Sequence, residues 1–177
     1  MCYLYKNTFE TPIGTMTSLV AEEGIYLLQF DDSLTTKQIE RVRKLYQRKI
    51  IEKEHAMNLK VKKELCEYLE GTRTEFTIPT IMNGTTFQAK VWQALKNIPY
   101  GTTIDYQGLG KKSGYPNASR AIGNANSSNL IMILIPCHRV IKSDGSIGGY
   151  AGGVSRKRSL LTLEENYIVS KNHYKVD

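Results

Sequence analysis

Residues 103–125 read TIDYQGLGKKSGYPNASRAIGNA, and their pattern decides the fold. We expect one short helix to begin between Thr103 and Tyr106 and to end at residues 113–116, where a glycine and a proline lie close together. A second helix is predicted to begin at Asn117. Two short helices around a tight turn that contains glycine indicate a helix-turn-helix motif.

The second helix of this pair carries one long charged side chain, Arg120, among small residues. These small residues are Ala118, Ser119, Ala121 and Gly123. A helix that reads the major groove of DNA needs several long polar side chains, whereas small residues let a backbone approach the minor groove, which is about 6 Å wide. One projecting arginine could then enter the base stack. Tight packing against a neighbouring helix is the alternative explanation for the small residues.

The segments on either side of this motif also have clear patterns. Before it, Thr86 is placed to cap an amphipathic helix that the sequence at 99–101 ends. After it, residues 130–135 form an apolar run of the length of a buried strand. We therefore expect a mainly helical domain in which a short buried strand leads to Cys137.

The thiol of Cys137 is followed by the imidazole of His138 and the guanidinium of Arg139. A single cysteine is most often inert, but a neighbouring histidine can lower the pKa of a thiol or relay its proton, and Arg139 adds positive charge. Consecutive side chains on an extended backbone point to opposite faces, so a direct bond between Cys137 and His138 is awkward. A bridging water is the expected relay.

The composition favours a soluble globular protein that is not exported. Of 177 residues, 41% are hydrophobic and 23% are charged, and no window approaches the roughly eighteen apolar residues of a membrane span. The N-terminus lacks the basic flank and apolar stretch of a signal peptide, so a cytoplasmic location is expected. The three cysteines, Cys2, Cys66 and Cys137, form no close-spaced ligand set, so neither a metal nor a cofactor is expected.

The net charge of +7 comes from the second half of the chain. Residues 1–84 contain 12 Lys/Arg and 12 Asp/Glu, whereas residues 85–177 contain 12 and 5. Such an asymmetry fits either a solvated basic surface or a polyanionic partner. Charge alone does not decide between the two.

The first half of the chain alternates strand-like and helical patterns. The strand-like segments are residues 14–21 and 24–30, and the helical ones are residues 35–47 and 59–71. The second helical pattern ends at Gly71, a residue typical of helix C-termini, and Cys66 beside its apolar stripe is interpreted as a small core residue. We place a domain boundary near Asn83, which predicts domains at 1–83 and 84–170 and a tail at 171–177.

The chain resembles the O6-alkylguanine-DNA alkyltransferases in four motifs. These are FQAKVWQALKNIPYGTTIDY at 87–106, PCHRV at 136–140, GGYAGG at 148–153 and KRSLLTLE at 157–164. The first half resembles the family's variable N-terminal domain through TPIGTM at 11–16 and YLEG at 68–71. The resemblance implies an α/β protein. Its N-terminal domain would be ribonuclease-H-like, and its C-terminal domain mainly helical, with a helix-turn-helix of the winged-helix-like kind.

The same resemblance implies direct-reversal DNA repair, in which each molecule transfers one alkyl group irreversibly from guanine O6 to its own cysteine. Cys137 would be the acceptor, His138 the water-linked base, and Glu164 the carboxylate that orients the histidine. Tyr106 would donate a proton to the departing guanine, and Arg120 would fill the gap left by the extruded nucleotide. The small residues around Arg120 would contact the DNA.

A further set of residues would form the substrate pocket and its hinge. They are Asn129, Val140, Tyr150, Ala151 and Lys157. The prolines that usually follow the hinge asparagine in the family are replaced by Leu130 and Met132. The implied partner is double-stranded DNA containing O6-alkylguanine, with O4-alkylthymine as an open alternative substrate. We expect a monomer that has no membrane partner.

Three other functions are weighed against repair. A thiol hydrolase would use the same Cys137 and His138 but would leave the helix-turn-helix without a purpose. A non-catalytic protein that binds alkylated bases would resemble relatives that typically carry tryptophan where this chain has Cys137. A DNA-binding regulator of this family would carry an additional zinc-cysteine module, which the cysteine count excludes.

Overall fold

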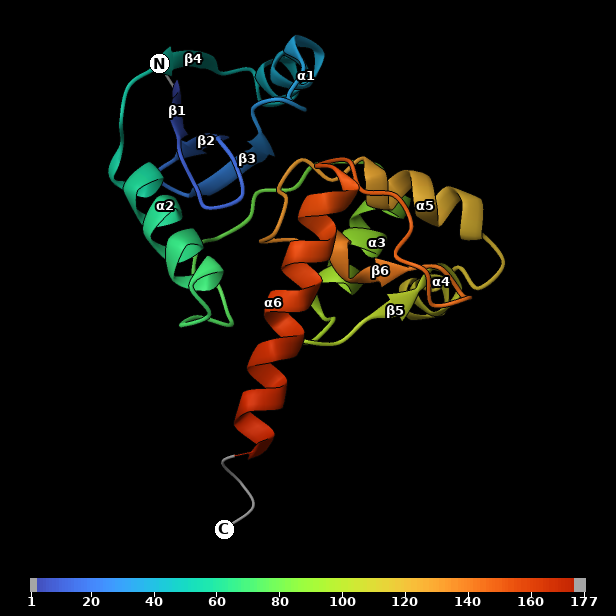
Figure 1. Cartoon of the computed structure of the whole chain (residues 1–177). Helices are drawn as coiled ribbons and strands as arrows, with labels where there is room; N and C mark the ends of the chain where they lie inside the picture. Colours follow the sequence, from blue (N-terminus) through green and yellow to red (C-terminus); the bar gives the residue numbers. More distant parts are fainter. Residues whose placement is uncertain (1–2, 174–177) are drawn as a thin grey trace. The chain divides into compact units, whose positions relative to one another are not determined.

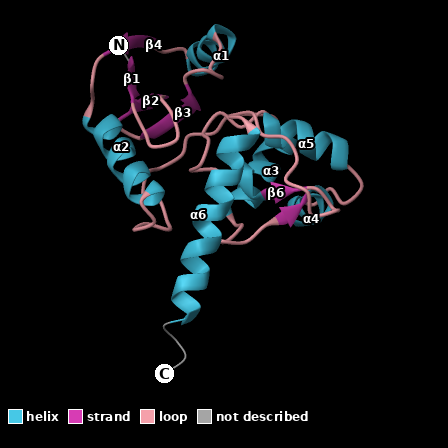
Figure 2. Cartoon of the chain, in the orientation of Figure 1, coloured by secondary structure: helices cyan, strands magenta, loops and turns pink. Residues whose placement is uncertain are grey.

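The computed structural model describes residues 3–173, and Cys2 lies outside the described residues. Contacts between residues divide the chain into two compact units. The first unit takes in the described residues up to Asn83 together with Leu130–Leu134. The second takes in Gly84–Asn129 and the described residues from Ile135 onward. Figure 1 labels the elements of both units, and Figure 2 shows that the longer strands belong to the first.

The first unit is built on a four-stranded sheet with the order β3-β2-β1-β4. Its strands are β1 (Tyr3–Phe9), β2 (Met16–Ala21), β3 (Gly24–Phe30) and β4 (Lys49–Glu52). The first three pair antiparallel, whereas β4 runs parallel to β1 with Leu4 opposite Ile50. The strand predictions at 14–21 and 24–30 correspond to β2 and β3, but the patterns gave no sign of β1 or β4.

Two helices complete the first unit, α1 (Thr36–Tyr46) and α2 (Ala56–Leu69). Each has a capping box, formed by Thr35 with Gln38 in α1 and by His55 with Asn58 in α2. Residues of β1, β2, β3 and α1 share one apolar core. It contains Leu4, Leu19, Ala21, Tyr26, Leu27 and Val42.

The second unit is mainly helical, as predicted. Its helices are α3 (Thr86–Lys96), α4 (Tyr106–Ser113), α5 (Ser119–Ser127) and α6 (Val154–His173). Helices α3, α4 and α5 contact one another, and Gly114, with φ of 85°, turns the chain from α4 towards α5. This arrangement confirms the helix-turn-helix prediction. The short strands β5 (Ile104–Asp105) and β6 (Val140–Ile141) pair in parallel.

Two predicted helix boundaries need small corrections. The N-cap of α3 is Thr85, because the Thr85 hydroxyl accepts a hydrogen bond from the backbone N–H of Gln88, and Thr86 is the first helical residue. Helix α5 begins at Ser119 instead of Asn117. Helix α6 continues through His173, because no glycine or proline interrupts it, and residues 174–177 of the predicted tail lie outside the described residues.

Residues 131–135 of the apolar run are buried and Leu130 is half-buried, but the run is not a strand. Ile133 has φ of 70°, in the left-handed region, which breaks an extended backbone. Two backbone hydrogen bonds join the run to β3, from Leu28 N–H to the Leu130 carbonyl at 2.8 Å and from Met132 N–H to the Leu28 carbonyl at 2.9 Å. Hydrophobic periodicity predicted the burial of this run, but its tight turn was not visible in the sequence.

Candidate functional site around Cys137

Cys137 begins a single 3-10 turn, Cys137–Arg139, which directly follows Pro136. The expectation that Cys137 and His138 lie on an extended backbone was therefore wrong. The thiol is buried, with the residue 4% exposed. The side-chain amide of Asn129 donates to the Ile135 carbonyl at 2.9 Å and to Cys137 Sγ at 3.1 Å. Asn129 thus fixes both the base of the loop 130–136 and the sulfur.

The surroundings of the thiol keep it protonated in this state. Burial raises the pKa of Cys137 to about 11, while the Asn129 hydrogen bond and the positive charge of Lys157 act in the opposite direction. Because a thiolate is the nucleophilic form, the thiol needs a nearby base before it can react.

The next residue, His138, carries an imidazole whose tautomer is fixed by Glu164 of α6. His138 Nε2 lies 2.8 Å from Glu164 Oε1, and both residues are buried. Although burial alone would raise it, hydrogen bonds and charges from His138 and Arg139 lower the pKa of Glu164 to about 2. An ionised carboxylate only accepts hydrogen bonds, so Nε2 carries the proton and Nδ1 is the basic nitrogen. Burial lowers the pKa of His138, which favours the neutral imidazole.

Arg139 is a site residue whose role was missed in the sequence. Its Nε lies 3.1 and 3.0 Å from the two oxygens of Glu164, its Nη2 lies 2.9 Å from Oε1, and its Nη1 donates to the Ile98 carbonyl at 2.6 Å. The guanidinium also lies over the ring of Tyr100. An arginine that follows a buried apolar run was the available signal, but its partner is 25 residues away in the chain.

Lys157 holds the other side of the site. It is fully buried, and its Nζ donates to the Val140 carbonyl at 2.6 Å and to the Gly149 carbonyl at 3.1 Å. Burial lowers the pKa of Lys157, and the charge of Cys137 opposes that shift. The lysine thus connects the start of α6, the loop before it and the turn that follows Cys137.

Two tyrosines face the same region. Burial raises the pKa of Tyr106, and the charge of Cys137 adds to the shift. The same two causes raise the pKa of Tyr150 well above its ordinary value. The buried Tyr150 hydroxyl has no hydrogen-bond partner among residues 3–173. The neighbouring Ala151 is exposed.

The residues at the start of α5 differ in their exposure to solvent. Ser119, Arg120 and Ala121 are exposed, whereas Ala118 and Gly123 are half-buried. A Cβ at Gly123 would lie 3.8 Å from the Tyr106 ring, an ordinary contact distance. Close packing therefore accounts for part of the helix, but not for the exposed segment that carries Arg120.

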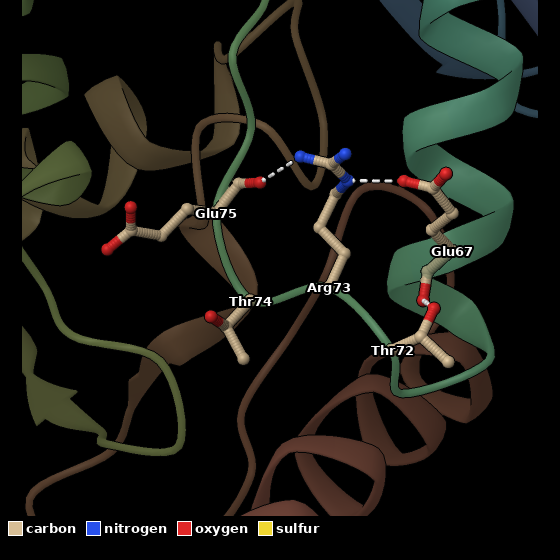
Figure 3. A pocket seen from close by; sticks show the side chains of 5 residues that line it. All are labelled: Glu67, Thr72, Arg73, Thr74 and Glu75. Carbon is tan, nitrogen blue, oxygen red and sulfur yellow. Dashed lines mark hydrogen bonds and ion pairs between the residues drawn. The ribbon is translucent and has the colours of Figure 1, made fainter.

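The first unit contains a separate hollow at the C-terminal end of α2. It is lined by Glu67, Thr72, Arg73, Thr74 and Glu75 (Figure 3). Arg73 Nε donates to Glu67 at 2.7 Å and Arg73 Nη1 to the Glu75 carbonyl at 3.0 Å, so the charge of the arginine is already paired. These contacts stabilise the loop.

Neither a metal site nor a membrane span was found in the part of the chain that the structure describes. Within residues 3–173, no three or more His, Cys, Asp or Glu side chains gather where they could hold a metal ion. Over the same residues, no helix combines the length and the hydropathy that crossing a bilayer requires.

Family models match both halves of the chain. The 6-O-methylguanine DNA methyltransferase ribonuclease-like domain matches residues 4–81, and the DNA binding domain of the same description matches residues 86–166. The first of these models corresponds to the α/β unit and the second to the mainly helical unit.

Individual relatives carry one recurring name. The methylated-DNA–protein-cysteine methyltransferase of Methanosarcina barkeri is 40% identical over 165 residues, which cover 93% of this chain and 99% of that protein. Its namesake from Mycobacterium leprae is 48% identical over 107 residues. That match covers 60% of this chain and 65% of the relative, just under two thirds of its length. The crystal structure of Mycobacterium tuberculosis OGT in complex with DNA is 33% identical, with a TM-score of 0.79 and 94% of each chain covered.

Proposed function

The chain belongs to the 6-O-methylguanine DNA methyltransferase family, and from that premise we propose that it repairs alkylated DNA directly. It extrudes an O6-alkylguanine from duplex DNA and transfers the alkyl group to Cys137. The observation that supports this proposal is that Cys137, His138 and Glu164 are all buried and that His138 Nε2 lies 2.8 Å from the Glu164 carboxylate.

The chemistry assigns a task to each polar group. A base inside a duplex hides its O6 substituent, so the nucleotide must leave the stack, and Arg120 on the exposed part of α5 takes its place. His138 Nδ1 accepts the thiol proton through a water. The sulfur then forms a bond to the alkyl carbon while the bond from that carbon to O6 breaks. Tyr106 donates a proton to the guanine as negative charge develops on it.

The remaining residues hold the base and the DNA. Asn129 fixes the reactive loop, and Val140, Tyr150, Ala151 and Lys157 line the guanine pocket. Ala118, Ser119, Ala121 and Gly123 let α5 approach the minor groove. We assign residues 1–83 and 84–170 to two domains that act as a monomer on double-stranded DNA in the cytoplasm. No cofactor enters the reaction, and the thioether product is stable, so each molecule reacts once.

A labelled duplex tests the proposal. A duplex with a radiolabelled methyl group on guanine O6 should transfer its label to the protein until the two are equimolar, and peptide mapping should place the label on Cys137. Cys137→Ser should bind the duplex without accepting label, and the matched control Cys66→Ser should react like the unmodified protein. Repeated turnover, or label on Cys66, would contradict the proposal.

A further inference from the structure

The segment that leads to the reactive cysteine is anchored on the first unit. Residues 130–134 belong to that unit, whereas Asn129 before them and Ile135 after them belong to the second. The side chain of Leu130 packs against the apolar core that β1, β2, β3 and α1 share. The chain therefore passes through the first unit immediately before it reaches Cys137.

The edge of β3 holds the start of this segment through backbone hydrogen bonds. Leu28 N–H donates to the Leu130 carbonyl at 2.8 Å, and Met132 N–H donates to the Leu28 carbonyl at 2.9 Å. Met132 stands where the family usually has a proline, which has no N–H and could not make the second bond. In this chain, hydrogen bonds to the sheet therefore hold a position that a proline would otherwise stiffen.

Two tight turns carry the chain from this anchor to the cysteine. Ile133 has φ of 70°, and the residue after it donates to the carbonyl of the residue before it at 2.8 Å, the features of a classic γ-turn. Pro136, with φ of −79° and ψ of 62°, forms an inverse γ-turn, in which Cys137 N–H donates to the Ile135 carbonyl at 2.8 Å. Such closely spaced turns transmit a displacement of the anchored segment to Cys137.

The conformation of Ile133 is unfavourable by itself. A side chain that branches at Cβ collides with the backbone in the left-handed region. Such a conformation persists only where the surroundings enforce it. Here the burial of the Ile133 side chain, which is 1% exposed, and the hydrogen bonds to β3 enforce it. Without these anchors, Ile133 would return to an extended backbone, and Cys137 would leave the place where Asn129 holds its sulfur.

We propose that Leu130 and Ile133 are positioning residues for alkyl transfer, through which the first unit holds the Cys137 sulfur where the reaction needs it. This proposal rests on the proposed function. Both residues act through the backbone of the loop and not through contact with the alkylated base. The groups assigned to the chemistry all belong to the second unit, so they give no reason for the rate to depend on the first.

Two leucines that pack against the same core separate positioning from stability. Leu130→Ala and Leu34→Ala each remove a partly buried side chain from that core, so the midpoint of urea unfolding should fall by similar amounts. The rate of methyl transfer from a saturating O6-methylguanine duplex should fall by about tenfold to a hundredfold in Leu130→Ala, because a misplacement of about 1 Å can cost a hundredfold. The rate should stay unchanged in Leu34→Ala. Because each molecule reacts once, the final amount of label counts the folded molecules, and the rate constant reports how those molecules react.

Glycine and alanine at position 133 test the left-handed turn itself. Both substitutions remove the buried side chain, but glycine adopts a positive φ as readily as a negative one, and alanine does not. Ile133→Gly should therefore react about fivefold faster than Ile133→Ala, or more, which corresponds to the cost of a left-handed conformation for an L-residue. It should also unfold at a higher urea concentration. If the side chain acted only by filling space, the order would be reversed, because glycine removes one more carbon atom.

Three outcomes would contradict the proposal. Equal rates in Leu130→Ala and Leu34→Ala would overturn it, since the core would then support the fold without positioning the thiol. A rate in Ile133→Gly that is equal to or below that of Ile133→Ala would also overturn it, and if Ile133→Ala does not fold, the leucine pair decides. If the unmodified protein transferred no methyl group from the duplex, the proposed function would fail, and the proposal with it.

Discussion

Glu164 of α6 is the residue on which two other segments of the chain converge. Its carboxylate receives hydrogen bonds from His138, from Arg139 and, at 2.9 Å, from the backbone N–H of Gly101. A buried carboxylate is tolerated only when such donors replace water. Arg139 balances the charge of Glu164, so that His138 can hydrogen-bond to the carboxylate and still stay neutral as a base.

The stability of this buried pair depends on both partners. Arg139→Met would leave Glu164 buried without its main counter-charge, and we expect the free energy of unfolding to fall by about 3–5 kcal/mol. Urea unfolding measures the loss. The matched control is Lys6→Met, which breaks the partly exposed Lys6–Glu52 pair and should change the free energy by less than about 1 kcal/mol. Equal effects of the two variants would contradict the role given to Arg139.

The base role of His138 predicts a pH profile. Burial lowers the pKa of His138 below its ordinary value of 6.5, and only the neutral imidazole can take the thiol proton. The rate should therefore fall as the pH drops through that lowered pKa, so the half-maximal rate lies below pH 6.5. Free O6-benzylguanine as substrate separates this effect from DNA binding.

A variant at Glu164 checks the assignment of that titration. The Glu164 hydrogen bond raises the pKa of His138, so Glu164→Gln should move the acid limb to lower pH and also reduce the maximal rate, because the nitrogen becomes less basic. A midpoint that does not move in Glu164→Gln would assign the titration to another group.

The site could be predicted from the sequence only in part. Cys137 and His138 stand together in a motif, and the resemblance identified Glu164 and Tyr106. Arg139 stands in the same motif, but its pairing with Glu164 was not visible in the sequence, because that pairing depends on burial and on a partner that the fold brings close.

At the scale of elements, the glycines of α4 show why helix propensity alone does not explain which residues a helix contains. Gly108 and Gly110 each weaken a helix by up to about 1 kcal/mol relative to alanine. However, a Cβ at Gly110 would lie 2.8 Å from the Tyr115 carbonyl oxygen, and one at Gly108 would lie 2.8 Å from Ile104 Cγ1. Gly110 therefore lets the turn after α4 pack closely against the helix, and Gly108 lets β5 do so.

The N-terminus of α3 offers a test at this scale. Thr85→Ala removes the hydroxyl that accepts the Gln88 N–H, and we expect a loss of about 1 kcal/mol in the free energy of unfolding. Thr86→Ala is the matched control: Thr86 is exposed and is the first helical residue, so its change should be close to zero. Urea unfolding followed by the fluorescence of Trp92, which packs in α3, measures both. If Thr86→Ala lowered the free energy of unfolding more than Thr85→Ala, Thr86 would be the N-cap, as the sequence predicted.

Elements with a repeating pattern were predictable, and those defined by partners distant in sequence were not. The amphipathic α3 and the α4–α5 turn follow from local spacing. The strand β4 pairs with β1 more than forty residues away, as Leu4 with Ile50, and the run at 130–134 takes its shape from β3. Its burial was visible in the sequence, but Ile133 at φ of 70° was not.

For the whole molecule, the excess of basic residues lies in the second half of the chain, where some are buried and others are exposed. Residues 85–177 carry 12 Lys/Arg against 5 Asp/Glu, whereas residues 1–84 are balanced at 12 and 12. Of the basic residues in the second half, Arg139 and Lys157 are buried at the reactive site. Exposed basic residues include Lys111, Lys112 and Arg120, all on the helix-turn-helix. The basic excess thus lies partly on the motif proposed to bind DNA.

This distribution predicts how DNA binding responds to salt. Phosphate contacts release counterions, so the logarithm of the affinity should fall linearly with the logarithm of the salt concentration, by about 0.9 for each phosphate neutralised. The exposed small residues of α5 provide no long side chains to read bases. Undamaged duplexes of unrelated sequence should therefore bind within about tenfold of one another.

Paired lysine variants decide whether the helix-turn-helix makes those contacts. Lys111→Ala with Lys112→Ala removes two adjacent exposed lysines of α4, and the salt slope should fall by up to about 2 because each can neutralise one phosphate. Lys62→Ala with Lys63→Ala makes the same change in the adjacent exposed lysines of α2 and should leave the slope unchanged. Titrations of labelled duplexes across a salt series measure both slopes. If the α2 variant lowered the slope and the α4 variant did not, the first unit would carry the phosphate contacts.

A strong preference for one undamaged sequence would instead favour a regulator, because a protein that must find alkylated guanine anywhere in a genome cannot depend on the bases around it.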